Sequence, residues 1–189
     1  MNLKNVDKKP LIFILTGPSG SGKTTIRKEL QKRFKDFFIS VSATTRERRK
    51  GERNGLDYIF LTQSQFRQWQ KEKKFLETVR RYGNYYGTPK VPILRALKEG
   101  KNCLLNLEPV GVEKIKKLFP DKTVTILIKP PSLREIARRL TNRLPEEREK
   151  RLSEDKRIFA SLLCDYSVLN KELKKAVAKI TEIIKGELR

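Results

Sequence analysis

Apolar residues along the chain gather into short runs that alternate with longer amphipathic stretches. The runs that predict strands are 11–15, 37–42, 58–61, 75–79, 103–107, 124–128 and 166–169. Helices are predicted at 24–34, after the N-cap candidate Thr62, at 89–99 and 112–119, after Ser132, and at 171–188. Because strands alternate with helices, the pattern predicts an α/β fold with a central parallel sheet covered on both faces.

Polar segments interrupt this alternation at several places. Residues 44–55 contain many arginines and no apolar period, which predicts an excursion out of the core. Residues 83–87 predict a turn region, and residues 142–157 are dense in charge and poor in apolar side chains. Residues 1–9 predict a flexible leader before one domain of ordinary length.

The composition adds a strongly basic charge balance. The chain of 189 residues has 44 Lys and Arg against 22 Asp and Glu, a formal net charge of +22. Anionic substrates, non-specific nucleic-acid binding and a solvated lysine-rich surface of the heat-adapted kind all fit this charge. We favour steering of anionic substrates together with a generic basic surface, and keep nucleic-acid binding as an alternative.

The remaining composition restricts the possible catalytic and metal chemistry and the cellular compartment. No apolar run is long enough to cross a bilayer, so we expect a cytoplasmic protein without membrane association. Cys103 and Cys164 are expected to be free thiols, and no zinc-ligand spacing is present. The chain has no histidine, which excludes a histidine general base.

The most specific motif is residues 17–24, GPSGSGKT, which fits the P-loop template G-x-x-x-x-G-K-[ST] at every fixed position. A predicted strand precedes it and a predicted helix follows it. Backbone N–H groups of such a loop and the helix N-terminus bind a polyphosphate, Lys23 reaches its terminal phosphates, and Thr24 is placed for Mg²⁺. The alternative is a glycine-rich turn that binds nothing. The expected nucleotide-binding residues are Gly17, Ser19, Gly20, Ser21, Gly22, Lys23, Thr24 and Thr25.

Further segments resemble the guanylate kinase family, in order and in register from about residue 11 to about residue 170. They are 40–58, 75–88, 105–111 and 128–133. The resemblance implies a three-layer P-loop NTPase fold with a GMP-binding insertion and a short helical lid. It divides a single domain, 10–189, into a core of 10–39, 89–137 and 158–189, a GMP-binding region of 40–88 and a lid of 138–157.

The resemblance also implies roles for individual residues. Those matching the GMP site are Ser42, Arg46, Arg49, Tyr58, Glu77, Tyr86, Gly87, Thr88 and Glu108. Arg143 and Arg151 match lid arginines that join Lys23 and Arg46 in catalysis, and Asn170 matches a residue near the adenine of ATP. The sequence reads Asn106-Leu107-Glu108 where the family usually has Asp-x-Asp, and Asn106 keeps an oxygen that could bind Mg²⁺.

Elementary chemistry supports these assignments. An arginine fork can hold a phosphate at two points. Guanine presents donors at N1–H and the 2-amino group that a carboxylate can accept, whereas adenine presents an acceptor at N1. A phosphorylated acceptor is already an anion, so no base is needed to activate it.

The sequence thus predicts ATP- and Mg²⁺-dependent phosphorylation of GMP, and also of dGMP, to the diphosphate in purine nucleotide metabolism. Two alternatives stay open. One is a kinase of the same fold acting on another phosphorylated acceptor. The other is a non-catalytic module of guanylate-kinase type that holds a phosphorylated ligand. The sequence leaves the oligomeric state open.

Overall fold

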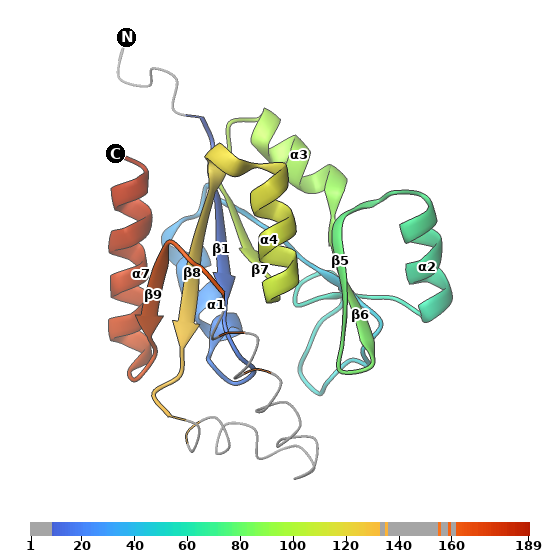
Figure 1. Cartoon of the computed structure of the whole chain (residues 1–189), viewed down its shortest axis with the longest axis horizontal. Coiled ribbons are helices and arrows are strands. Elements are labelled where there is room, and N and C mark those ends of the chain that lie inside the picture. Colours follow the sequence, from blue (N-terminus) through green and yellow to red (C-terminus); the bar gives the residue numbers. More distant parts are fainter. Residues whose placement is uncertain (1–8, 133–134, 136–154, 156–158, 160–161) are drawn as a thin grey trace.

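The computed structural model describes residues 9–132, 135, 155, 159 and 162–189 (Figure 1). Most of the predicted leader and of the predicted lid, with Arg143 and Arg151, lies outside these residues. Ser132 is described, and its Oγ accepts a hydrogen bond of 3.1 Å from the Glu135 N–H. No helix in the described part of the chain has the length and apolar character needed to span a bilayer.

A parallel sheet forms the centre of the molecule. In the described residues it has five strands in the order β2-β7-β1-β8-β9. These strands are β1 (Ile12–Thr16), β2 (Phe38–Ile39), β7 (Cys103–Asn106), β8 (Thr123–Lys129) and β9 (Tyr166–Leu169). The central parallel sheet predicted from the alternating pattern is therefore confirmed.

Helices cover both faces of this sheet, which explains the continuous apolar run of β1. Phe13 and Leu15 of β1 pack in one cluster with the helices α1 (Lys23–Arg33) and α7 (Leu173–Glu187). Ile12 and Ile14 point the other way and pack with the helices α3 (Lys90–Lys98) and α4 (Pro109–Leu118). A strand buried on both faces has apolar residues at successive positions, not at alternate ones.

A second, smaller sheet lies beside the first, in the region predicted to bind GMP (Figure 1). Its order in the described residues is β4-β3-β6-β5, with β3 parallel to β4 and the other pairs antiparallel. The strands are β3 (Ala43–Thr44), β4 (Ile59–Phe60), β5 (Phe75–Arg81) and β6 (Asn84–Pro89). The helix α2 (Gln63–Lys71) packs Phe66 against the Phe75 ring at 4.6 Å, and Thr62 caps it as predicted.

Two local predictions are wrong. The apolar run 37–42 is not one strand, because the chain leaves the parallel sheet after β2 and enters the second sheet at β3. Residues 83–87 are not a turn region, because Asn84 begins the strand β6. The turn between β5 and β6 consists of Tyr82 and Gly83, whose φ angles are 51° and 77°. Positive φ at both positions is the geometry of a tight two-residue hairpin loop.

Candidate active site

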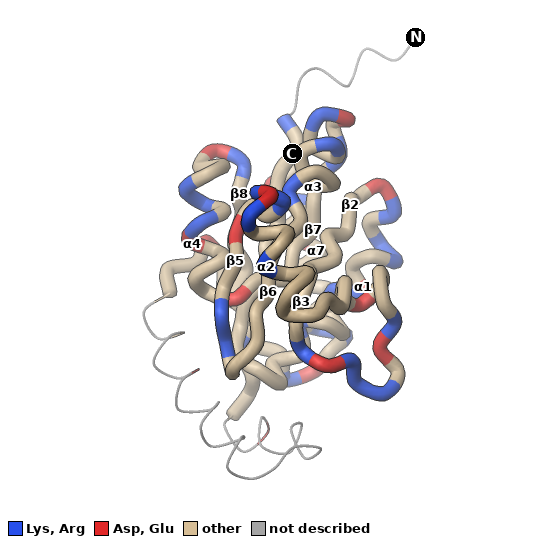
Figure 2. The backbone as a smooth tube through the Cα atoms, turned by 90° about the vertical axis from the view of Figure 1, so that its right-hand side faces the viewer, with Lys and Arg blue, Asp and Glu red and all other residues tan. Residues whose placement is uncertain are grey.

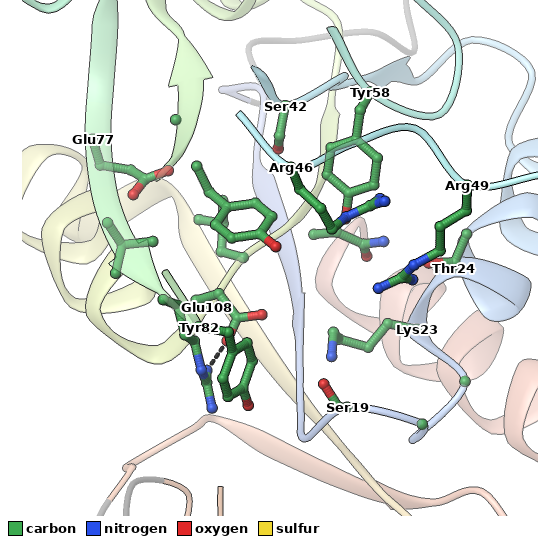
Figure 3. A pocket seen from close by; sticks show the side chains of 18 of the residues that line it. Ser19, Lys23, Thr24, Ser42, Arg46, Arg49, Tyr58, Glu77, Tyr82 and Glu108 are labelled. Carbon is green, nitrogen blue, oxygen red and sulfur yellow. Dashed lines mark ion pairs between the residues drawn. The ribbon is translucent and has the colours of Figure 1, made fainter. Parts of the chain in front are cut away.

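A pocket of about 420 Å³ lies between the phosphate loop and the second sheet (Figure 3). Many of the predicted site residues line it together. They are Ser19, Gly20, Gly22, Lys23, Thr24, Thr25, Ser42, Arg46, Arg49, Tyr58, Glu77, Tyr86, Gly87, Asn106 and Glu108. The loop that follows β1 and the residues that follow β7 meet here, because carboxyl ends of parallel strands share one edge of the sheet.

Other predicted residues support the pocket from behind. Asn170 is buried and its Nδ2 donates a hydrogen bond of 2.8 Å to the Ser21 carbonyl, so it braces the phosphate loop. Gly22 has φ 94°, and a Cβ there would lie 2.3 Å from Asn170 Nδ2, so this position requires glycine. Gly17, Ser21 and Thr88 do not line this pocket, although Thr88 donates a hydrogen bond to Glu77, which does.

Lys23 lies across the phosphate loop. Its Nζ donates to the carbonyl oxygens of Gly17 and Pro18. Burial lowers the pKa of Lys23 to about 8, with the negative charge of Asp155 opposing this shift and the positive charge of Arg81 adding to it. The ammonium is therefore still charged at neutral pH, and Lys23 lines the pocket.

Arg46 is oriented by neighbours within its own loop. Its Nη2 donates to both oxygens of Glu52, at 2.8 and 3.0 Å, and its guanidinium lies 5.3 Å from the Tyr58 ring centroid. Glu52 also accepts from the Arg49 N–H at 2.9 Å. Partial burial raises the pKa of Glu52, but the hydrogen bonds from Arg46 and Arg49 outweigh this and hold it below its usual value. A single carboxylate thus fixes the loop that carries both predicted phosphate-binding arginines.

Glu77 is a buried carboxylate on the side of the pocket away from Arg49 (Figure 3). Glu77 is only 6% exposed, and its Oε1 accepts a hydrogen bond of 2.6 Å from Thr88 Oγ1. Oε2 is buried and has no hydrogen-bond partner among the described residues. Burial raises the pKa of Glu77, although Thr88 and Lys114 oppose the shift. Because an unsatisfied buried carboxylate oxygen costs free energy, Glu77 is poised for a ligand that donates hydrogen bonds.

Oxygen atoms suited to Mg²⁺ lie near the phosphate loop. The Thr24 hydroxyl and the Asn106 side chain line the same pocket, and Asn106 Oδ1 is buried without a hydrogen-bond partner in the described part of the chain. Mg²⁺ takes oxygen ligands and, in nucleotide-binding sites, combines few protein groups with phosphate oxygens. These two residues therefore fit a magnesium ion that arrives with a nucleotide.

The pocket also contains residues that the sequence analysis missed, namely Val79, Arg81, Tyr82 and Leu107. Arg81 pairs with Glu108 and with Asp155, and Tyr82 follows it in the hairpin turn. Strand alternation could have found Arg81, because Glu77, Val79 and Arg81 share one face of β5. The predicted strand ended at Val79, two residues before the end of β5 at Arg81.

Comparisons with known proteins agree with this geometry. A sequence model of the family described as guanylate kinase matches residues 8–187. A guanylate kinase of Clostridium perfringens (strain ATCC 13124) is 40% identical over 191 residues, which cover 99% of this chain and 88% of that protein. A guanylate kinase of Caldanaerobacter subterraneus subsp. tengcongensis is 38% identical, over 97% of this chain and 90% of that protein.

A solved structure is also similar. The crystal structure of guanylate kinase from Anaplasma phagocytophilum superposes with a TM-score of 0.79 at 27% sequence identity, covering 96% of this chain and 87% of that one. The family match, the relatives and this structure all extend over nearly the whole chain. The protein belongs to the guanylate kinase family.

Proposed function

We propose that this protein transfers the γ-phosphoryl group of ATP to GMP, giving ADP and GDP, and that dGMP is also accepted. Family membership and relatives named guanylate kinase at 38–40% identity support an ATP-dependent GMP kinase. We also infer a single domain that is divided into a core, a GMP-binding region and a lid, and a location in the cytoplasm.

One observation carries the choice of base. Glu77 Oε2 is buried in the pocket wall without a hydrogen-bond partner in the described residues, while Thr88 holds the other oxygen. Guanine brings adjacent N1–H and 2-amino donors that such an oxygen can accept. Adenine brings an unprotonated N1 to the same place, which leaves the carboxylate unpaired and repelled. A site of this kind discriminates strongly, because the wrong base forfeits a buried hydrogen bond to a charged group.

The opposite side of the pocket suits the acceptor phosphate. Arg46 and Arg49 extend into the pocket there, close to Tyr58 and Lys23 (Figure 3). Their guanidinium groups can hold a dianionic phosphate by charge-assisted hydrogen bonds. A nucleotide with its base at Glu77 and its phosphate at these arginines presents that phosphate to the phosphate loop.

Catalysis then depends on position and charge. The loop N–H groups and the start of α1 bind the donor phosphates, and Lys23 offsets the charge that develops between donor and acceptor. The acceptor is already anionic, so the absence of histidine from the sequence is no obstacle. A magnesium ion held by Thr24 and Asn106 with the ATP phosphates would add further charge neutralisation there. Arg143 and Arg151 keep their proposed role in closing over the transferred group.

The two alternatives from the sequence gain no support from the pocket. A phospho-ligand binding module has no need of a phosphate loop whose Lys23 and Thr24 face the acceptor site. A kinase for another phosphorylated acceptor would not need a buried carboxylate oxygen opposite the arginines.

An assay of ADP release tests the proposal. ATP and Mg²⁺ are supplied with GMP, dGMP, AMP, UMP or CMP in turn. We expect turnover with the two guanine nucleotides, and a loss of about 10³-fold in Lys23→Ala with folding intact. Tight ATP binding without turnover on any acceptor would contradict the proposal, and so would equal turnover in the lysine variant.

A further inference from the structure

Arg81 is a buried arginine beside the proposed guanine subsite. It stands at the end of β5, is 8% exposed, and lines the same pocket as Glu77 and Glu108. Its Nη1 pairs with Glu108 Oε2 and its Nη2 with Asp155 Oδ1. The dashed line in Figure 3 marks the ion pair with Glu108. The two arms of one guanidinium therefore join residues that lie far apart in the sequence.

Asp155 anchors this arginine to the phosphate loop. The aspartate is 3% exposed, and its Oδ2 accepts a hydrogen bond of 2.7 Å from the Ser19 N–H. Its Oδ1 accepts from Arg81 and, at 2.5 Å, from the Tyr82 hydroxyl. A carboxylate with donors on both oxygens is well satisfied, so it holds its partners in one geometry.

Arg81 itself is unsuited to hold the acceptor phosphate. Both of its Nη atoms are engaged by carboxylates, and aromatic rings flank the guanidinium, with centroids at 4.9 Å for Tyr82 and 5.5 Å for Phe159. Capturing a phosphate would break buried ion pairs, which is costly. Its effect on the substrate must therefore pass through the groups it holds.

Glu108 is the group through which that effect passes. It follows β7 at the rim of the pocket, and a glutamate side chain loses much rotamer freedom when fixed. The ion pair to Arg81 imposes that order before the substrate arrives. A carboxylate offers about four acceptor sites, so Glu108 can still accept hydrogen bonds from a base while it is paired.

We propose that Arg81 is a positioning residue for guanine recognition, which orients the Glu108 carboxylate toward the base and is itself held by Asp155 on the phosphate loop. This inference rests on the proposed function, because it assumes that a guanine occupies the pocket beside Glu77. It assigns a specificity role to a buried ion-pair network that a purely structural interpretation would assign to stability alone.

The test is a double-mutant cycle on acceptor kinetics. Arg81→Lys keeps the charge but cannot reach two carboxylates with a planar fork. We expect the KM for GMP to rise about tenfold, the preference for GMP over AMP to fall by a similar factor, and the KM for ATP to stay within about twofold. In a Glu108→Gln background the same change should add less than about twofold. Arg80→Lys is the matched control, because Arg80 is exposed on the other face of β5.

The outcomes distinguish a positioning role of Arg81 in guanine recognition from a purely structural role. Equal losses from Arg81→Lys in both backgrounds, or equal rises in the KM values for GMP and ATP, would overturn the inference. If Arg81→Lys does not fold, Asp155→Asn takes its place in the cycle, with the preference for GMP over AMP as the only readout because Asp155 also contacts the phosphate loop. Equal losses of that preference in the two Glu108 backgrounds would overturn the inference. A wild-type protein that fails to phosphorylate GMP would instead refute the proposed function.

Discussion

Neighbouring arginines in the polar loop after β3 have different surroundings. Arg46 lines the pocket, pairs with Glu52 and stacks near Tyr58, whereas Arg48 is exposed and does not belong to the pocket lining. We predict that Arg46→Ala raises the KM for GMP by about 10- to 100-fold, because a charge-assisted hydrogen bond to phosphate is lost. Arg48→Ala should leave it unchanged. Steady-state kinetics with varied GMP measure both effects, and equal changes in the two variants would contradict the assignment.

How far the sequence predicts this site differs from residue to residue. Lys23 is predicted from its position in the P-loop motif, and Glu77 from a segment that resembles the guanylate kinase family. The partners of Arg81 are not, because Glu108 and Asp155 lie far along the chain and meet it only in the folded protein. The vacant oxygen of Glu77 also depends on packing that no local pattern contains.

At the scale of elements, helix α4 packs against the strand that carries Glu77. A Cβ at Gly111 would lie 2.9 Å from Glu77 Oε2. We predict that Gly111→Ala weakens GMP binding about tenfold, because the added methyl group displaces the carboxylate or blocks its free oxygen. Calorimetric titration with GMP measures this loss.

A helical glycine elsewhere provides the control for that substitution. Gly186 of α7 has open space around its Cβ position. Gly186→Ala should leave GMP binding intact and raise the free energy of unfolding by about 0.5–1 kcal/mol through helix propensity. Unchanged GMP affinity in Gly111→Ala would show that α4 does not constrain Glu77.

Asp165 directly precedes the edge strand β9 and forms hydrogen bonds with the neighbouring strand β8. It accepts hydrogen bonds from the Thr125 N–H at 2.8 Å and from Thr125 Oγ1 at 2.6 Å, and it pairs with Lys116. Burial raises the pKa of Asp165, but these partners outweigh burial and lower it overall. A folded-state pKa below the unfolded value stabilises the protein above the unfolded pKa, and this contribution is lost as the pH falls through the folded pKa.

Asp165→Asn should therefore lower the free energy of unfolding by about 1 kcal/mol at pH 7, and the difference from wild type should shrink below about pH 4. Urea unfolding at several pH values measures it. Asp121→Asn, in an exposed turn, is the control. A difference that stays constant down to pH 2 would contradict this role of the carboxylate.

Helices and strands were predicted correctly where one periodic pattern covers the whole element. The buried strand β8 and the helix α3 were found because an apolar run or a helical period spans each of them. The hairpin strand β6 was missed because Asn84 and Gly87 resemble turn residues. Gly87 is needed for another reason, since a Cβ there would lie 2.8 Å from the Phe75 ring. Tertiary packing, not turn geometry, explains that glycine.

At the scale of the whole molecule, the parallel sheet follows from the alternating pattern but the second sheet does not, because β3 and β4 have only two residues each and the pairing of its strands depends on the tertiary fold. The charge is also a property of the whole chain. Lysine and arginine are spread over several helices and loops (Figure 2), and the sequence carries a net charge of +22. Non-specific nucleic-acid binding stays a prediction.

This charge leads to a prediction about substrate capture. A strongly positive protein attracts dianionic GMP from a distance, and added salt screens that attraction. We expect kcat/KM for GMP to fall several-fold between about 20 and 200 mM KCl, while kcat at saturating GMP stays nearly constant. Sucrose at matched osmolality is the control. A kcat/KM that is independent of KCl would show that the charge does not steer the substrate.

The base preference of Glu77→Gln tests guanine recognition by this carboxylate most directly. The ratio of kcat/KM for GMP to that for AMP is measured in wild type and variant, with thermal melting to check folding. We predict that the ratio is large in wild type and falls about 100-fold in the variant, because a neutral amide accepts the guanine donors more weakly than a carboxylate does and can donate to adenine N1. An unchanged ratio in a folded variant would contradict the claim that the vacant oxygen of Glu77 reads guanine.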